Sequence, residues 1–163
     1  MNKRSFHNAE PSKGESENTW YTPPELIEKM QTKFDLDPCT NSTRPYDIAT
    51  HNIEHDLGQD GFNMKWSGFV FCNPPYGKET GKWLDKMSNH GNGVALVFSR
   101  CETRWAQKAL NECDAVNFIK GRISFIKKDK SKSGSAACGS MLLAWGEFAV
   151  EAIKRVEGIV FKR

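Results

Sequence analysis

The amino-acid sequence predicts an α/β fold, a compact single domain whose central sheet is mostly parallel. Short apolar runs of strand length alternate with segments of helical periodicity through the middle of the chain. These strand runs are apolar throughout, which is typical of a sheet covered on both faces. The length of 163 residues suits one domain, which we expect over residues 18–163 after a polar, flexible tail at residues 1–17.

The first elements are predicted from turn and cap signals. Thr22 is expected to cap a helix that starts at Pro23, because proline suits the first helical position. Residues 34–37 form a strand candidate that stops at Pro38. Residues 40–64 are polar and rich in turn signals, so we expect them to be irregular.

The later elements follow from apolar runs and helical spacing. The predicted strands are 69–72, 94–98, 116–119, 123–126, 141–145 and 159–161, and the predicted helices lie around 83–87, 105–110 and 148–156. Small residues at 134–139 predict a flexible loop between two strands.

Composition excludes several classes of protein. With 38% hydrophobic and 26% charged residues, the chain is neither disordered nor fibrous. No apolar run approaches the roughly 18 residues of a membrane span. The polar amino-terminal stretch lacks the apolar core of a signal peptide, so we expect a cytoplasmic protein.

Neither the cysteines nor the histidines predict a metal or disulfide framework. The five cysteines form no C-x-x-C pair. His51 and His55 have the i, i+4 spacing that could hold a metal on a helix, but no third ligand accompanies them. We therefore predict no metal site.

The charge distribution is uneven. The net charge is only +3, yet residues 120–132 hold six basic residues against Asp129. Such a segment suits a polyanion such as nucleic acid. The alternative is a solvated loop that binds nothing.

The tetrapeptide Asn73-Pro74-Pro75-Tyr76 carries the clearest chemical signal. It directly follows the buried strand predicted at 69–72, and ligands of open α/β sheets bind at the carboxyl ends of strands. Asparagine offers an acceptor and two donors, proline leaves backbone carbonyls free, and tyrosine offers a flat face. Together they can grip a planar group that bears an exocyclic amine. The alternative is a rigid loop whose tyrosine packs on the core.

The tetrapeptide resembles the catalytic motif of amino-methyltransferases that use S-adenosylmethionine. More of the chain resembles one family, the phage-type DNA N-6-adenine methyltransferases (Dam). The matching pieces, in the order of the family, are Trp20-Tyr21-Thr22-Pro23-Pro24-Glu25, Phe34-Asp35-Leu36-Asp37-Pro38-Cys39, Asp60-Gly61-Phe62 with Trp66, Phe71-Cys72-Asn73-Pro74-Pro75-Tyr76-Gly77, Arg100 with Thr103-Arg104-Trp105, and Gly121-Arg122-Ile123-Ser124-Phe125.

This resemblance implies a Rossmann-like methyltransferase fold and an S-adenosylmethionine site near Asp37, Pro38 and Cys39. A glycine-rich loop, which many methyltransferases have after this strand, is absent from the sequence. Other cofactor contacts implied by the resemblance are Tyr21, Thr22 and Pro23, over the methionine part, and Asp60, near the adenine. On sequence alone, Asp37 could equally be a solvated turn residue or the cap of a following helix, and Asp60 a simple Asp-Gly turn.

The implied reaction is methyl transfer to a flipped-out adenine in double-stranded DNA, inside the cytoplasm of a bacterial or phage-infected cell. Asn73 and Pro74 would accept the two N6–H bonds, with Pro75 shaping the loop and Tyr76 stacking on the base. The residues expected to contact DNA are Arg100, Arg104, Arg122, Lys127, Lys128, Lys130 and Lys132. Two alternatives stay open: a methyltransferase for RNA or a protein glutamine amide, and an inactive domain that only binds nucleic acid.

Overall fold

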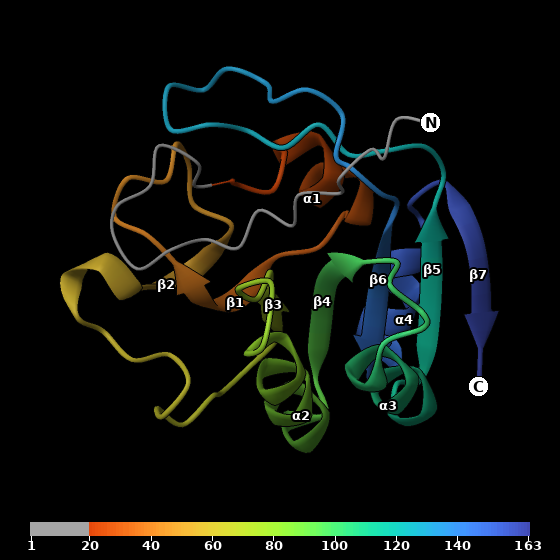
Figure 1. Cartoon of the computed structure of the whole chain (residues 1–163). Coiled ribbons are helices and arrows are strands. Elements are labelled where there is room, and N and C mark those ends of the chain that lie inside the picture. The colour runs from red at the N-terminus through yellow and green to blue at the C-terminus, as the bar shows by residue number, and fades with distance from the viewer. Residues whose placement is uncertain (1–19) are drawn as a thin grey trace, which may run out of the picture.

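The computed structural model describes residues 20–163 and contains a seven-stranded sheet in the order β2-β1-β3-β4-β6-β5-β7 (Figure 1). The tail predicted at residues 1–17 lies outside the described residues. The strands are β1 (Phe34–Thr40), β2 (Ala49–Glu54), β3 (Val70–Cys72), β4 (Gly93–Phe98), β5 (Ala115–Ile119), β6 (Ser140–Trp145) and β7 (Gly158–Lys162). The helices are α1 (Pro24–Met30), α2 (Thr80–His90), α3 (Arg104–Glu112) and α4 (Glu147–Lys154), with a short 3-10 helix, η1 (His55–Leu57).

Strand direction divides the sheet into two halves. Strands β2, β1, β3 and β4 pair in parallel, whereas β6 is antiparallel to both β4 and β5, and β7 is antiparallel to β5. The prediction of a mostly parallel sheet therefore holds for the first half, and the second half is antiparallel. Strands β1, β3, β4 and β5 consequently end at the same edge of the sheet, which we call the carboxyl edge; it is uppermost in Figure 1.

Helices cover both faces of the sheet. In Figure 1, α2 and α3 lie in front of the strands and α4 lies behind them. Trp83 and Met87 of α2 pack with Ala106 of α3 in one apolar cluster, and Met30 of α1 packs with Ile153 of α4 in the other. This two-sided burial explains why the central strands are apolar throughout rather than alternating.

Three sequence predictions near the amino terminus were wrong. Strand β1 continues through Pro38, because its pairing with β2 shifts register between Asp37 and Thr40 and so needs no regular ladder bond there. The polar segment 40–64 contains β2 and η1. Pro23, not Thr22, precedes the first residue of α1, and no side chain caps that helix.

The strand predicted at 123–126 was also wrong. Only Ile126 pairs, through isolated bridges to Tyr21 and Lys132, so the segment from Lys120 to Gly139 is a long loop. Two backbone hydrogen bonds between Ile126 and Tyr21, at 2.8 and 2.9 Å, join this loop to the segment that precedes α1. The remaining predicted strands and helices are confirmed within a few residues at their ends.

Gly61 brings the β2–β3 connection into close contact with β1. A Cβ at this position would lie 1.8 Å from the Pro38 carbonyl oxygen, so only glycine fits. The Trp66 indole N–H donates to the Gly61 carbonyl at 2.7 Å and fixes the contact. The residues that follow η1 are thereby held against the end of β1.

Replacing Gly61 with alanine should therefore force Pro38 away and lower the free energy of unfolding by ~1–3 kcal/mol, as overpacking does elsewhere. Gly134→Ala is the matched control, because a Cβ there meets nothing within 4 Å. Urea unfolding of the two variants measures the difference. Equal midpoints would contradict the close approach.

Candidate active site

The Asn73–Tyr76 loop leaves the carboxyl end of β3 and leads into α2. Pro74 is buried and Pro75 exposed, so the loop turns outward between them. The Thr80 hydroxyl, in the first turn of α2, donates to the Pro75 carbonyl at 2.8 Å. The loop is thus anchored to the sheet at one end and to a helix at the other.

The Asn73 amide is held on both sides. Its Nδ2 donates to Thr22 Oγ1 at 3.3 Å, and its Oδ1 accepts from the Tyr76 hydroxyl at 3.0 Å. An amide oxygen has two lone pairs, so one acceptor position of Oδ1 remains beyond the tyrosine bond. The amide can therefore accept a further N–H without losing its present contacts.

One face of the Tyr76 ring is covered. The ring stacks on Phe98, at the end of β4, with 4.3 Å between centroids and 19° between planes. Burial raises the pKa of the Tyr76 hydroxyl, so this group stays protonated and acts as a donor. Sequence analysis missed Phe98; the signal was its place at the end of the strand that follows the tetrapeptide.

Asp37 is a buried carboxyl in the middle of β1, the strand beside β3. Its side chain is 4% exposed and Oδ1 accepts one bond, from the Cys39 backbone N–H at 3.2 Å. Burial raises its pKa to about 7, although the Cys39 N–H and the Arg44 charge oppose the shift. A buried carboxylate of this kind fits a ligand that brings an ammonium group or hydroxyls, as S-adenosylmethionine does.

The other residues predicted to bind the cofactor surround Asp37 unevenly. Tyr21 is buried, with its hydroxyl 2.8 Å from Thr43 Oγ1, and Cys39 is half-buried with a thiol whose pKa burial raises. Pro23, also half-buried, follows Thr22. All these residues lie at or beside the carboxyl edge.

Asp60 lies in an exposed turn. Its carboxylate accepts bonds from the Phe62 and Asn63 backbone N–H groups and from the Asn63 amide, and these bonds lower its pKa. The Gly61–Pro38 contact brings this turn beside Pro38, the neighbour of Asp37 in β1. The structure thus brings Asp60 near the predicted cofactor residues, and its carboxylate oxygens accept hydrogen bonds within the turn.

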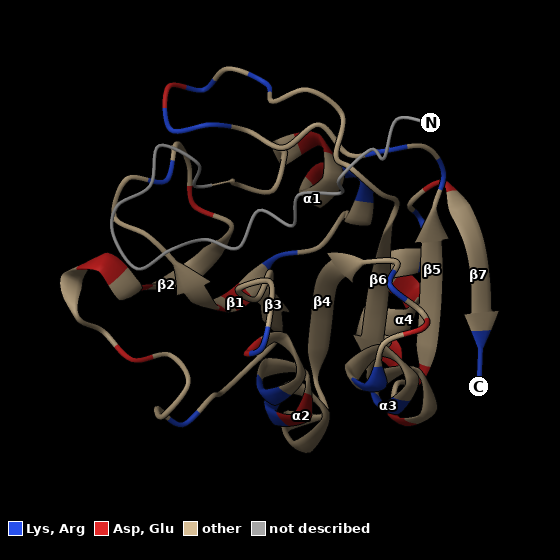
Figure 2. Ribbon diagram, in the orientation of Figure 1, with Lys and Arg blue, Asp and Glu red and all other residues tan. Residues whose placement is uncertain are grey.

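The predicted DNA-contacting residues are all exposed and lie on three segments. Arg100 follows β4, Arg104 begins α3, and the rest lie on the 120–139 loop. Figure 2 shows basic positions along this loop, above α1. Lys132 pairs with Glu25 at 3.4 Å, and the Lys127 ammonium lies 5.9 Å from the centre of the Trp20 ring.

Lys128 and Lys130 form the tip of the loop. Lys130 has a positive φ of 66° in a turn closed by the bond from its N–H to the Lys127 carbonyl. Neither lysine makes an ion pair with any described residue, so both ammonium groups face solvent.

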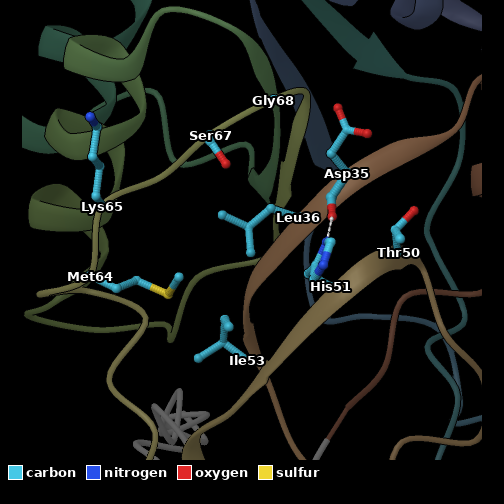
Figure 3. Close-up of a pocket in the computed structure, with 9 residues that line it drawn as sticks. All are labelled: Asp35, Leu36, Thr50, His51, Ile53, Met64, Lys65, Ser67 and Gly68. Carbon is cyan, nitrogen blue, oxygen red and sulfur yellow. Dashed lines mark hydrogen bonds between the residues drawn. The ribbon is translucent and has the colours of Figure 1, made fainter.

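A cavity of about 410 Å³ lies away from these residues, between the β1–β2 face and the segment from Met64 to Gly68. Leu36, Ile53 and Met64 converge on it, and His51 Nδ1 lies 3.3 Å from the Asp35 carbonyl oxygen (Figure 3). No predicted site residue is among its described lining residues.

His51 lies in β2 and His55 in η1, so their i, i+4 spacing does not place them on one helix.

None of the helices in the described residues, 20–163, has the length and apolar character of a membrane span.

Comparison with known proteins identifies the family. The model of the family described as DNA N-6-adenine-methyltransferase (Dam) matches residues 10–158, that is, 149 of the 163 residues. Searches of curated proteins and of solved structures found no match. The seven-stranded sheet with its parallel first half agrees with the Rossmann-like methyltransferase fold. The chain therefore belongs to the DNA N-6-adenine-methyltransferase (Dam) family, whose members use S-adenosylmethionine to methylate adenine N6 in DNA.

Proposed function

We propose that the Asn73–Tyr76 loop is the catalytic centre of this DNA adenine methyltransferase, and that it acts on an adenine flipped out of the duplex. The observation that supports this most is the Asn73 amide, which is fixed on both sides and keeps an acceptor position free at the carboxyl edge. Adenine N6 is inaccessible to a protein pocket within the stacked duplex, so the base must leave the stack.

The residues of the loop orient the target amine. Asn73 Oδ1 and the Pro74 carbonyl accept the two N6–H bonds and thereby direct the nitrogen lone pair toward the methyl donor. Pro75 restricts the loop, and Tyr76 stacks its uncovered face on the adenine while Phe98 supports the other. Such preorganised contacts act by orientation and electrostatics, so no base is needed before attack.

S-adenosylmethionine, when bound, supplies an electrophilic methyl group. Asp37 accepts hydrogen bonds from its ammonium group or ribose hydroxyls, with Pro38 and Cys39 forming the adjoining wall. Tyr21, Thr22 and Pro23 enclose the methionine part, and Asp60 lies toward the adenine. The buried, singly bonded carboxyl of Asp37 supports this assignment.

The basic residues hold the DNA backbone. Lys127, Lys128, Lys130 and Lys132 lie on the 120–139 loop, which also carries Arg122 near its start, and Arg100 and Arg104 follow β4. Their contacts go to phosphate, which positions the duplex without reading its sequence.

Transfer of a labelled methyl group tests the proposal and its alternatives. The wild-type protein should label adenine N6 in duplex DNA and leave RNA and protein glutamine unlabelled. Asn73→Ala should slow transfer by at least the ~10²-fold typical of losing one preorganised polar contact, with cofactor affinity unchanged. The control is Asn111→Ala, which removes an exposed amide on α3. Near-full activity of Asn73→Ala would remove this residue from catalysis.

The raised pKa of Asp37 predicts a pH-dependent stability. Between its ordinary value of 3.8 and the folded value of about 7, the folded protein keeps a proton that the unfolded chain has lost. The free energy of unfolding should therefore fall as pH rises through this window. Asp37→Asn should remove the loss, so that at about pH 8 the variant is more stable than wild type by a few kcal/mol, with a small difference at about pH 4.

The same variant should weaken cofactor binding by roughly 10- to 100-fold, because it loses a charge-assisted hydrogen bond. Asp47→Asn is the control, since Asp47 is exposed and also lies beside Arg44. Thermal unfolding at the two pH values and calorimetry with S-adenosylmethionine measure both effects. If Asp37→Asn binds cofactor as wild type does, the cofactor site lies elsewhere.

The basic loop predicts a salt-dependent affinity. The slope of log K against log salt is about −0.9 per phosphate neutralised on duplex DNA. Replacing Lys127, Lys128, Lys130 and Lys132 with glutamine should flatten this slope and weaken binding to all sequences similarly. The charge-matched control replaces exposed lysines away from the carboxyl edge, namely Lys33, Lys65, Lys108 and Lys162. An unchanged slope in filter-binding titrations would contradict phosphate binding by these lysines and would mean that the loop is solvated surface.

A further inference from the structure

We infer that Thr22 is a positioning residue for the reaction: its hydroxyl holds the Asn73 amide so that Oδ1 faces the target amine. The inference rests on the catalytic role proposed for Asn73 and adds a residue that acts through it. Thr22 Oγ1 accepts the Nδ2–H of Asn73 at 3.3 Å across 51 positions of sequence.

The Thr22 hydroxyl does not cap helix α1, although its position in the sequence suggests that role. A threonine before two prolines and a helix usually caps that helix. Here Pro23 occupies the cap position, and the helix has no side-chain cap bond. The side chain is instead 2% exposed and directed to Asn73. A buried hydroxyl needs a partner, and the catalytic amide is the one that the structure provides.

Thr22 is also held rigidly, as a positioning group must be. On one side, the Tyr21 backbone makes two bonds to Ile126, at 2.8 and 2.9 Å. On the other side, Pro23 has its φ fixed at −65° by its ring. The hydroxyl is thus placed by the fold rather than by the loop that it supports, which is what precise positioning requires.

The orientation of the Asn73 amide decides whether the site can work. Rotating the side-chain amide by half a turn exchanges its oxygen for its NH2 group. The NH2 group would then face the N6–H donors of adenine, and no hydrogen bond could form between the two donors. Thr22 and Tyr76 together hold the amide plane, with Oδ1 on the Tyr76 side. The Tyr76 hydroxyl shares Oδ1 with the incoming amine, whereas Thr22 bonds the far side of the amide and stays in place throughout.

This role predicts an effect on rate rather than on cofactor affinity. The bond that the structure gives the Thr22 hydroxyl goes to Asn73. Losing the hydroxyl should therefore lower kcat at saturating cofactor and DNA, and leave the dissociation constant for S-adenosylmethionine unchanged.

Thr22→Val and Thr22→Ser test the inference. Valine keeps the shape of threonine but cannot accept the bond, and we expect kcat to fall about tenfold, as the loss of one hydrogen bond would give. Serine keeps the hydroxyl and should restore kcat to within about threefold. Cofactor affinity by calorimetry should stay within about twofold in both. Thr43→Val, which removes the nearby hydroxyl bonded to Tyr21, should keep the wild-type kcat.

A second readout does not depend on turnover. The side-chain amide signals of Asn73, assigned by their absence in Asn73→Ala, should shift in the NMR spectrum of Thr22→Val and stay near their wild-type positions in Thr22→Ser. Unchanged signals in Thr22→Val would overturn the inference, as would an unchanged kcat or a loss of cofactor affinity alone. A wild-type protein that fails to methylate DNA adenine would instead overturn the proposed function, and the NMR result would still decide the contact.

Discussion

The end of strand β3 is the constraint on which the site depends. Strand β3 ends at Cys72, and beyond Asn73 two successive prolines offer the ladder no backbone N–H. The chain must leave the sheet there, at the edge where β1 and β4 also end. Asn73 is consequently presented at that edge, and Tyr76 turns back until its ring rests on Phe98. Two residues without hydrogen-bond donors thus place the two side chains that carry the proposed chemistry.

The buried Asp37 carboxyl lowers the stability of the ligand-free protein at neutral pH. A carboxylate buried to the extent of Asp37, with one backbone N–H as partner, makes the folded state less stable at neutral pH than an amide would. A core position selected for stability alone would not carry this group. This arrangement supports the proposal that Asp37 binds a ligand that brings hydrogen-bond donors. Gly61 packs against Pro38, the residue after Asp37, and the Trp66 indole bonds the Gly61 carbonyl.

Sequence reasoning predicted the strands and helices of the sheet core because their burial on both faces leaves long apolar runs. It missed β2, whose residues are partly exposed at the sheet edge and therefore look irregular. It ended β1 at Pro38, because the register shift that admits a proline depends on the partner strand. It placed Asn73 directly after a buried strand, and β3 does end at Cys72. It assigned the Thr22 hydroxyl to a helix cap, because its actual partner is 51 residues away and no local pattern shows that contact.

The link between the basic loop and the proposed catalytic loop is short. Ile126 precedes the lysines of the loop and forms the bridge to Tyr21, and the next residue, Thr22, bonds Asn73. The loop whose lysines are proposed to meet phosphate is therefore joined, through Ile126, Tyr21 and Thr22, to the amide proposed to meet the target base. A loop fixed only to its own turn could bind DNA in many poses relative to the pocket. Because this loop is bonded at Ile126 to the segment that holds Asn73, the fold fixes where its lysine-bearing part begins relative to the amide proposed for catalysis.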